Sequence, residues 1–293
     1  MIKEIRDYLE TVALDKSKNT VSVYTIGLGK FVDYFNFSDF ESLKNINFAD
    51  CRKYQAYLVS TGLAKSSVNH YILTVKVFYN YLVEIEEIER SPFEKMKKLK
   101  TEKKNPTFLS LEEVSAFIGA CEKPDDLIIM SLLLTAGLRR DELVNLKLSD
   151  VRDGRIVILG KGKKIRTFPL QKEVIDILNK YIEYRNKKYR TDSEYLLISK
   201  MGDKYSGEAI RQRIHTIGVR AGLSEERLKE IHTHTTRHTF CANLIDSGAD
   251  IRVVQGAMGH ASLGTTMIYA HLRNETLDNA ILNQKSIFDN KEK

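Results

Sequence analysis

The chain has 293 residues, enough for two domains, and its 42% hydrophobic and 29% charged content is ordinary for a globular protein. Lys and Arg number 46 against 39 Asp and Glu, a net charge of +7 that fits nucleic acid as a partner as well as a generic basic surface. The three scattered cysteines exclude a disulfide framework and a CxxC metal pair. With no leader pattern and no membrane-length apolar run, we expect a soluble cytoplasmic protein.

Four successive segments of the first ninety residues carry apolar side chains at helical spacing. The third begins at about Phe48, after the N-cap candidate Asn47, and the fourth begins near Ser66. Pro92 ends the pattern. Four helices with short connections predict a small all-α bundle. We assign to its core, rather than to a base-stacking surface, the aromatic residues Phe31, Phe35 and Tyr79.

A run of lysines follows the bundle, where the apolar periodicity stops before Pro106. The run consists of Lys95, Lys97, Lys98, Lys100, Lys103 and Lys104. We interpret residues 95–108 as a linker between a helical domain, residues 1–94, and a second domain, residues 109–293. The lysines form either a solvated tether or a strap along a phosphate backbone, and the run alone does not decide between them.

The second domain mixes helices with a β-hairpin. A capping-box pattern from Ser110 to Glu113 opens a helix, and the apolar run 127–135 predicts a buried one. Strands 155–159 and 165–169 flank a glycine-containing turn, which predicts an antiparallel hairpin. The remaining predicted elements are helices 171–188, 206–221 and 235–247, a third strand at 195–199, and two short helical segments near 251–258 and 265–269.

Two arginines, Arg139 and Arg140, directly follow the apolar run after Gly137. An arginine at this point is well placed to project into a cleft, where Glu142, one turn on, would fix its guanidinium by charge-assisted hydrogen bonds. The alternative is an ordinary surface pair. Other basic residues are either solvated or contact DNA: Lys161, Lys163 and Lys164 at the hairpin tip, and Arg211 and Arg213 on helix 206–221.

Residues 232–272 gather five of the seven histidines of the chain. His234 and Arg237 are three residues apart at the start of a predicted helix, where backbone N–H groups also favour an anion. Together with His232 and His238, His234 also forms an H-x-H-x3-H spacing that is able to ligate zinc. Neither a cysteine nor an HExxH glutamate completes such a site, so we favour no metal.

Three segments, together with the helical region before the linker, resemble the tyrosine recombinases, the family of phage integrases and Xer-type recombinases. The segments are TAGLRRDELVNLKLSD, ILGKGKKIRTFPL and HTTRHTFCANLIDSGADIRVVQGAMGHASLGTTMIYAHL. The resemblance covers nearly the whole chain. It implies a mainly α fold: a four-helix, SAM-like core-binding domain followed by a mixed α+β catalytic domain with a small antiparallel sheet.

The resemblance also implies a role for each matching residue. Arg139, rather than Arg140, takes the place of the first arginine, because of its spacing to Glu142 after Thr-Ala-Gly-Leu. The implied catalytic residues are Arg139, Lys161, His234, Arg237, His260 and the nucleophile Tyr269, supported by Glu142. The implied DNA contacts are Lys97, Lys98, Lys100, Lys103, Lys104, Lys163, Lys164, Arg211 and Arg213. In this interpretation the other histidines, His232, His238 and His271, have structural rather than catalytic roles.

The expected activity is the cutting and rejoining of double-stranded DNA through a 3′-phosphotyrosyl link, with no metal or other cofactor. The resemblance implies a tetramer on paired sites, with residues 277–282 forming a helix that docks on a neighbouring subunit. A partner recombinase or an accessory protein is a further candidate partner. The rival functions are a type IB topoisomerase, a DNA-binding regulator that does not cleave, and a zinc hydrolase.

Overall fold

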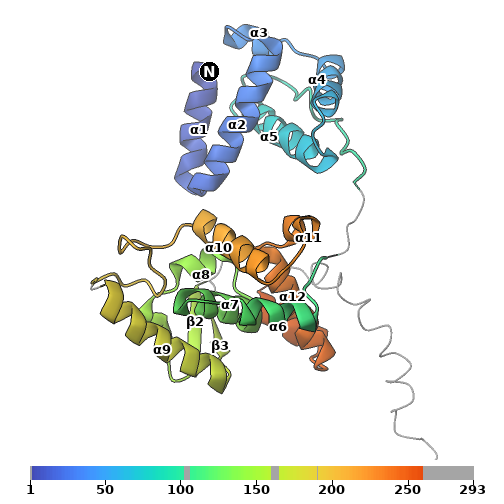
Figure 1. The fold of residues 1–293 in the computed structure, drawn as a ribbon. Coiled ribbons are helices and arrows are strands. Elements are labelled where there is room, and N and C mark those ends of the chain that lie inside the picture. The colour runs from blue at the N-terminus through green and yellow to red at the C-terminus, as the bar shows by residue number, and fades with distance from the viewer. Residues whose placement is uncertain (1, 102–105, 160–164, 190, 260–293) are drawn as a thin grey trace, which may run out of the picture. The chain divides into compact units, whose positions relative to one another are not determined.

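The computed structural model describes residues 2–101, 106–159, 165–189 and 191–259. The chain divides into two compact units, Met1–Lys104 and Asn105–Lys293, and each is described by itself (Figure 1). In the described ranges no helix is both long and apolar enough to cross a membrane. The helical segments predicted near 265–269 and 277–282 lie outside these ranges.

The first unit is entirely helical, as predicted. Its helices are α1 (Lys3–Asp15), α2 (Lys18–Phe35), α3 (Phe40–Lys44), α4 (Phe48–Ser60) and α5 (Lys65–Glu84). Asn47 caps α4 in a capping box with Asp50, because each side chain accepts from the other residue's backbone N–H. The sequence did not predict α3, because its five residues are too few to show a helical period.

The core of this unit is built around the fully buried ring of Phe31. The ring meets Tyr54, Tyr79 and Phe93 at centroid distances of 5.1, 5.9 and 5.8 Å, each edge to face. Such contacts add to the stabilisation that burial alone provides. Phe35 packs against Phe31 at 5.2 Å. Of the aromatic side chains predicted to be core residues, Phe31 and Tyr79 are fully buried, and Phe35 is partly buried against them.

The first part of the predicted linker lies on this unit. The Asn69 side chain accepts from the Leu99 backbone N–H at 2.8 Å and donates to the Leu99 carbonyl at 2.9 Å. Gln55 donates to the Lys97 carbonyl at 3.4 Å, and the Met96 side chain is buried. These contacts fix the backbone and leave Lys97, Lys98 and Lys100 exposed to solvent.

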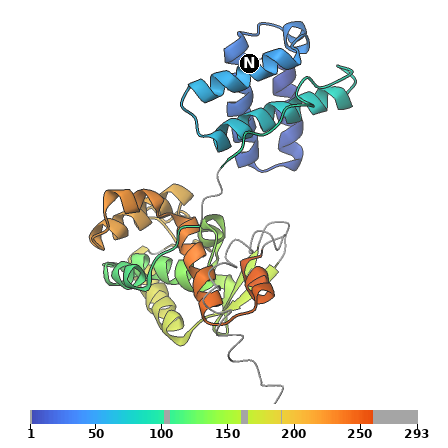
Figure 2. The same ribbon diagram turned by 90° about the vertical axis from the view of Figure 1, so that its right-hand side faces the viewer.

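The second unit surrounds the buried helix α7, which packs against α9 and α12 (Figures 1 and 2). Its helices are α6 (Leu111–Gly119), α7 (Pro124–Ala136), α8 (Arg140–Asn145), α9 (Lys172–Tyr189), α10 (Gly207–Arg220), α11 (Glu225–Glu230), α12 (Thr233–Asp246) and α13 (Ile251–Met258). The Ser110–Glu113 capping box forms as predicted at the start of α6. The six-residue helix α11 was not predicted.

A three-stranded antiparallel sheet lies beside these helices, in the order β1 (Val151–Arg152), β2 (Arg155–Leu159) and β3 (Ile165–Pro169). The predicted hairpin is confirmed, with Ile156 opposite Phe168 and Ile158 opposite Arg166. Because side chains alternate along a strand, Arg166 shares the face of Phe168 and the buried isoleucines.

The predicted strand at 195–199 is wrong, since the third strand of the sheet is β1. Residues 195–199 form only isolated bridges, Lys147 with Tyr195 and Ile198 with Lys204. Leu196, Leu197 and Ile198 are fully buried, and the Leu196 backbone N–H donates to the Leu146 carbonyl at 2.7 Å. An apolar run that is buried in a loop has the sequence pattern of a buried strand.

Candidate active site

The first component of the site is the turn between α7 and α8. Helix α7 ends at Gly137, which adopts a left-handed conformation with φ of 56°, and Arg139 precedes α8 as its N-cap residue. Glu142 accepts the Arg139 backbone N–H at 2.8 Å through Oε2 and the Arg139 guanidinium at 2.9 Å through Oε1. One carboxylate therefore both caps the helix and orients the arginine, whereas Arg140 is half exposed and pairs with Asp141.

The second component is α12, which begins just after His232 and carries His234 and Arg237 in its first two turns. The Arg237 side chain is buried with 4% of the residue exposed, and it donates to the carbonyl oxygens of Gly137 and Met258. These bonds fix the guanidinium between the end of α7 and the end of α13. Two backbone oxygens thus help to hold the Arg237 guanidinium in place.

His234 lies close to this cluster of positive charge. Its side chain keeps contact with solvent, yet its pKa lies below the usual value. The main cause is partial desolvation of the ring, followed by the positive charges of His232, Arg237, Arg139 and Arg140. A neutral imidazole, which is able to accept a proton, is therefore the favoured state of His234 at neutral pH.

The carbonyl oxygen of Met258, at the end of α13, is the point where the guanidinium groups meet. Arg139 donates to it from Nη2 at 3.3 Å, Arg166 from Nη1 at 3.0 Å, and Arg237 from Nη2. The last carbonyls of a helix carry partial negative charge, which favours cations. Gly259, with φ of 58°, ends α13, and the next residue in the chain is His260.

Sequence reasoning missed Arg166. Its Nη2 lies 2.6 Å from Glu142 Oε2, and its guanidinium carbon lies 5.4 Å from the centre of the Phe168 ring. The signal that would have found it is the strand alternation, because an arginine two residues before Phe168 must share the buried face of the hairpin. Arg139 and Arg166 therefore share the carboxylate of Glu142, while all three guanidinium groups donate to the Met258 carbonyl.

Several predicted residues lie outside the part of the chain that the structure describes. They are Lys161, Lys163 and Lys164 in the hairpin turn, Lys103 and Lys104 in the linker, and His260, Tyr269 and His271. Of the six predicted catalytic residues, the described structure brings together Arg139, His234 and Arg237.

The two arginines predicted on α10 have different surroundings. Arg213 donates to the fully buried Asp126 at 2.7 Å and to the Tyr205 hydroxyl at 2.8 Å. Asp126 also accepts from Arg220 at 3.2 Å, so Arg213 is one of two arginines that neutralise this buried carboxylate, and its contacts are internal to the unit. Arg211 is exposed and pairs with Glu208, a neighbour on the same helix face.

The histidines of α12 do not gather into a metal centre within the described residues, where no group of three or more His, Cys, Asp or Glu side chains is suitably placed. His232 Nδ1 lies 2.9 Å from the Glu230 carbonyl and 2.9 Å from the Thr235 hydroxyl. His238 is half-buried, and burial lowers its pKa to about 4, with further contributions from His234, His232 and Arg237.

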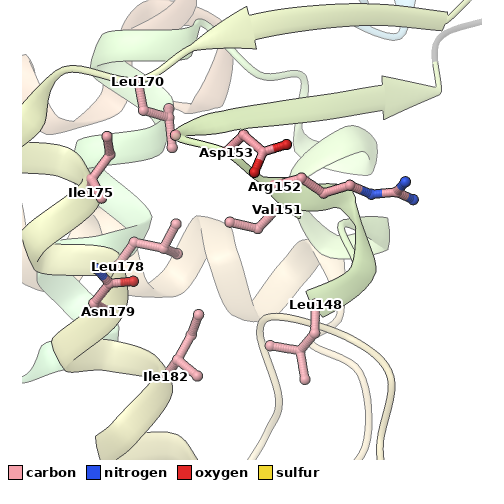
Figure 3. Close-up of a pocket in the computed structure, with 10 residues that line it drawn as sticks. Leu148, Val151, Arg152, Asp153, Leu170, Ile175, Leu178, Asn179 and Ile182 are labelled. Carbon is pink, nitrogen blue, oxygen red and sulfur yellow. The ribbon is translucent and has the colours of Figure 1, made fainter.

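A separate pocket of about 530 Å³ lies between the β1–β2 turn and α9 (Figure 3). Most of its walls are aliphatic side chains, among them Leu148, Leu178 and Ile182, and its charged groups are Arg152 and Asp153. It contains none of the residues around Met258. The arginine cluster is therefore the better candidate for phosphate chemistry.

Comparison with known proteins agrees with this geometry. Residues 107–276 match the phage integrase family, and residues 5–85 match the N-terminal SAM-like domain of phage integrases. The chain is 32% identical over 286 residues to the tyrosine recombinase XerC of Staphylococcus aureus (strain MSSA476), with 94% of each chain covered.

The chain is also similar to solved structures of recombinases bound to DNA. A XerH site-specific recombinase bound to its difH substrate before cleavage is 26% identical, with a TM-score of 0.72 over 93% of this chain and 83% of that one. A lambda integrase dimer bound to a core site is 16% identical and shares the fold, with a TM-score of 0.71 over 89% of this chain and 94% of that one.

The chain therefore belongs to the phage integrase family of tyrosine recombinases. Within that family it is a Xer-like, tyrosine-type site-specific DNA recombinase.

Proposed function

We propose that the arginine cluster holds the scissile phosphodiester of a double-stranded DNA site while Tyr269 attacks it. The observation that carries the proposal is the meeting of Arg139 and Arg237 at the Met258 carbonyl, two residues before His260 in the chain. Three guanidinium groups donate to this carbonyl, and two of them also contact the carboxylate of Glu142, which gives the described cluster an excess of positive charge. Such a site suits an anion whose charge grows in the transition state.

In the proposed reaction the phenolic oxygen of Tyr269 bonds to phosphorus, and the bond from phosphorus to the 5′-oxygen breaks. The products are a 3′-phosphotyrosyl link and a free 5′-hydroxyl. The neutral imidazole of His234 takes the phenolic proton, which is otherwise lost only near a pH of about 10. Lys161 gives a proton to the departing 5′-oxygen, and His260 donates to a non-bridging oxygen. No cofactor is needed for this exchange.

We infer that lysines and one arginine outside the cluster contact the DNA backbone. The candidates are Lys97, Lys98, Lys100, Lys103, Lys104, Lys163, Lys164 and Arg211. The ordered backbone of the segment up to Leu99 supports this choice, because it presents the first of these lysines from a fixed position. Each contact that neutralises a phosphate releases counterions, so binding should weaken steeply with added salt.

We propose that residues 1–94 and 109–293 act as two domains on one DNA site, joined by residues 95–108. Strand exchange through a Holliday junction would require a tetramer on two paired sites, with a partner recombinase or an accessory protein as a further candidate partner. The free state of Cys51, Cys121 and Cys241 fits action in the cytoplasm.

The test begins by capturing the chain with its covalently bound DNA from cells and sequencing that DNA. A nicked duplex of the recovered site then traps the covalent adduct, which is detected on a denaturing gel. Tyr269→Phe should bind this duplex and form no adduct, whereas Tyr195→Phe, a tyrosine of the same unit, should react normally. An adduct from Tyr269→Phe would refute the assignment of the nucleophile.

A plasmid that carries two copies of the site separates recombination from its rivals. A recombinase yields resolved or inverted products, a type IB topoisomerase yields relaxed circles alone, and a regulator yields neither. A requirement for added zinc would support the hydrolase instead.

A further inference from the structure

Arg166 reaches the candidate site from β3, and the mechanism proposed above gives it no role. Its side chain is 14% exposed, and it contacts two groups that Arg139 also contacts. One is the Glu142 carboxylate, where Arg166 Nη2 lies 2.6 Å from Oε2 and Arg139 Nη1 lies 2.9 Å from Oε1. The other is the Met258 carbonyl oxygen, 3.0 Å from Arg166 Nη1 and 3.3 Å from Arg139 Nη2.

In this arrangement Arg166 supports the position of Arg139 through the groups that both arginines contact. Two forked guanidinium groups clamp one carboxylate and one carbonyl, so that Glu142 has no freedom to turn away from Arg139. Because Glu142 also accepts the Arg139 backbone N–H, a displaced Glu142 would release both the side chain and the backbone of Arg139. Burying a charged side chain has an unfavourable free energy of desolvation. An arginine whose only role was stability would therefore not need to be at this mostly buried position.

The backbone around Gly259 fits the same role. A Cβ added at Gly259 would lie 2.5 Å from Arg166 Nη1, so a larger residue there would displace this guanidinium from its present position. The left-handed φ of 58° at Gly259 also favours glycine. Arg166 therefore sets the distance between the hairpin and the residues immediately before His260.

The hairpin connects Arg166 to a second proposed catalytic group. β2 and β3 flank the turn that contains Lys161, and Arg166 is the second residue of β3. Its contact with Glu142 thus attaches this strand to α8. Its contact with Met258 attaches the strand to α13, the helix that precedes His260. Among the hydrogen bonds and ion pairs of the described residues, only those of Arg166 join a hairpin side chain to α8 or α13, so Arg166 supplies this polar connection.

We propose that Arg166 is a positioning residue that holds Glu142, and through it Arg139, in the orientation that stabilises the reacting phosphate. This inference rests on the proposed roles of Arg139 and Glu142. It requires that the loss of Arg166 should affect cleavage through Arg139 rather than through DNA binding or folding.

The first measurement is single-turnover adduct formation by the full chain on the nicked duplex of the captured site. Arg166→Gln should slow it by about tenfold or more, a fraction of the loss of a direct donor, while DNA affinity stays within about threefold. Arg166→Lys, which keeps the charge and reaches one of the two acceptors, should be intermediate. In a Glu142→Gln background Arg166→Gln should add less than about threefold, because the two side chains act as one unit.

The second measurement uses a duplex with a methylphosphonate at the scissile position. One non-bridging oxygen is replaced by a methyl group, so the transition state carries less charge and needs Arg139 less. Arg166→Gln and Arg139→Ala should both regain rate relative to the wild type on this substrate. A purely structural defect would slow both substrates equally.

Arg185→Lys is the matched control for Arg166→Lys, because Arg185 is also buried but donates to the Ser193 and Tyr195 carbonyls. It should lower the melting temperature without changing the ratio of the two rates. The proposal is overturned by normal cleavage in Arg166→Gln, by full additivity with Glu142→Gln, or by an unchanged methylphosphonate ratio. If Arg166→Gln does not fold, the same ratio in Arg166→Lys decides. An adduct formed by Tyr269→Phe would instead refute the nucleophile and leave the Arg166 comparison standing.

Discussion

Arg237 donates a hydrogen bond from Nη1 to the carbonyl oxygen of Gly137, joining α12 to the end of α7. The two residues are a hundred positions apart in the chain. Gly137 ends α7 in a left-handed conformation, and the chain continues directly to Arg139. The same glycine turn therefore accepts a hydrogen bond from Arg237 and leads the chain into Arg139.

Gly137→Ala should destabilise the second unit and slow cleavage. A left-handed conformation costs an L-residue about 1–2 kcal/mol, and the added Cβ would overlap the Phe240 ring, so we expect a total loss of about 2 kcal/mol or more. Urea denaturation of the full chain checks this. Gly119→Ala is the control, because a Cβ there meets nothing within 4 Å and Gly119 is the last residue of α6, so the free energy of unfolding should stay the same or rise by up to about 1 kcal/mol.

Arg139→Ala should reduce single-turnover cleavage by about a hundredfold or more, as expected for the loss of a transition-state donor. Arg140→Ala should reduce it by less than about tenfold, because Arg140 pairs with Asp141 and is half exposed. Adduct formation under equal DNA saturation compares the two variants. The reverse ranking would show that Arg140 is the catalytic arginine.

The free energy of unfolding should fall as the pH is lowered from about 6.5. The pKa values of His234 and His238 are below their ordinary value in the folded chain, that of His238 at about 4. The unfolded chain therefore binds protons that the folded chain does not, and acid favours unfolding. Urea titrations between pH 6.5 and about 5 avoid most carboxylate protonation, which occurs near a pKa of about 4.

His238→Gln should make this pH dependence shallower, because one of the two depressed imidazoles is removed. An equally steep dependence in the variant would mean that His238 does not contribute.

Thr239→Val should destabilise the second unit by about 1–3 kcal/mol, because it leaves the Leu109 backbone N–H buried without its acceptor. That N–H donates to the fully buried Thr239 hydroxyl at 2.8 Å, which fixes the start of the unit to the helix that carries Arg237. Thr239→Ser keeps the hydroxyl and should recover most of the loss in a denaturant titration. Equal stabilities of the two variants would contradict this role for the hydroxyl.

Local patterns in the sequence predicted most of the fold. The helical period found the four long helices of the first unit, and Asn47 and Ser110 marked the helix starts correctly because capping is a contact between residues three apart. The pattern failed where an element is very short, as in α3 and α11, and where a loop is buried, as at 195–199. Neither a five-residue helix nor a buried loop has a distinctive period.

The sequence by itself determined the family resemblance and the residues Arg139, His234 and Arg237, because their residue types and local spacing are visible along the chain. Only the tertiary structure decided that Arg139 reaches the end of α13, that Arg213 pairs with a buried aspartate, and that Arg166 also contacts Glu142. These outcomes depend on contacts between residues 24 to 120 positions apart, such as those that join Glu142 to Arg166 and Arg139 to Gly259. Such contacts form only when α7, α12, α13 and the hairpin pack together and bring the donors and acceptors within reach. A pattern of neighbouring residues therefore does not predict them.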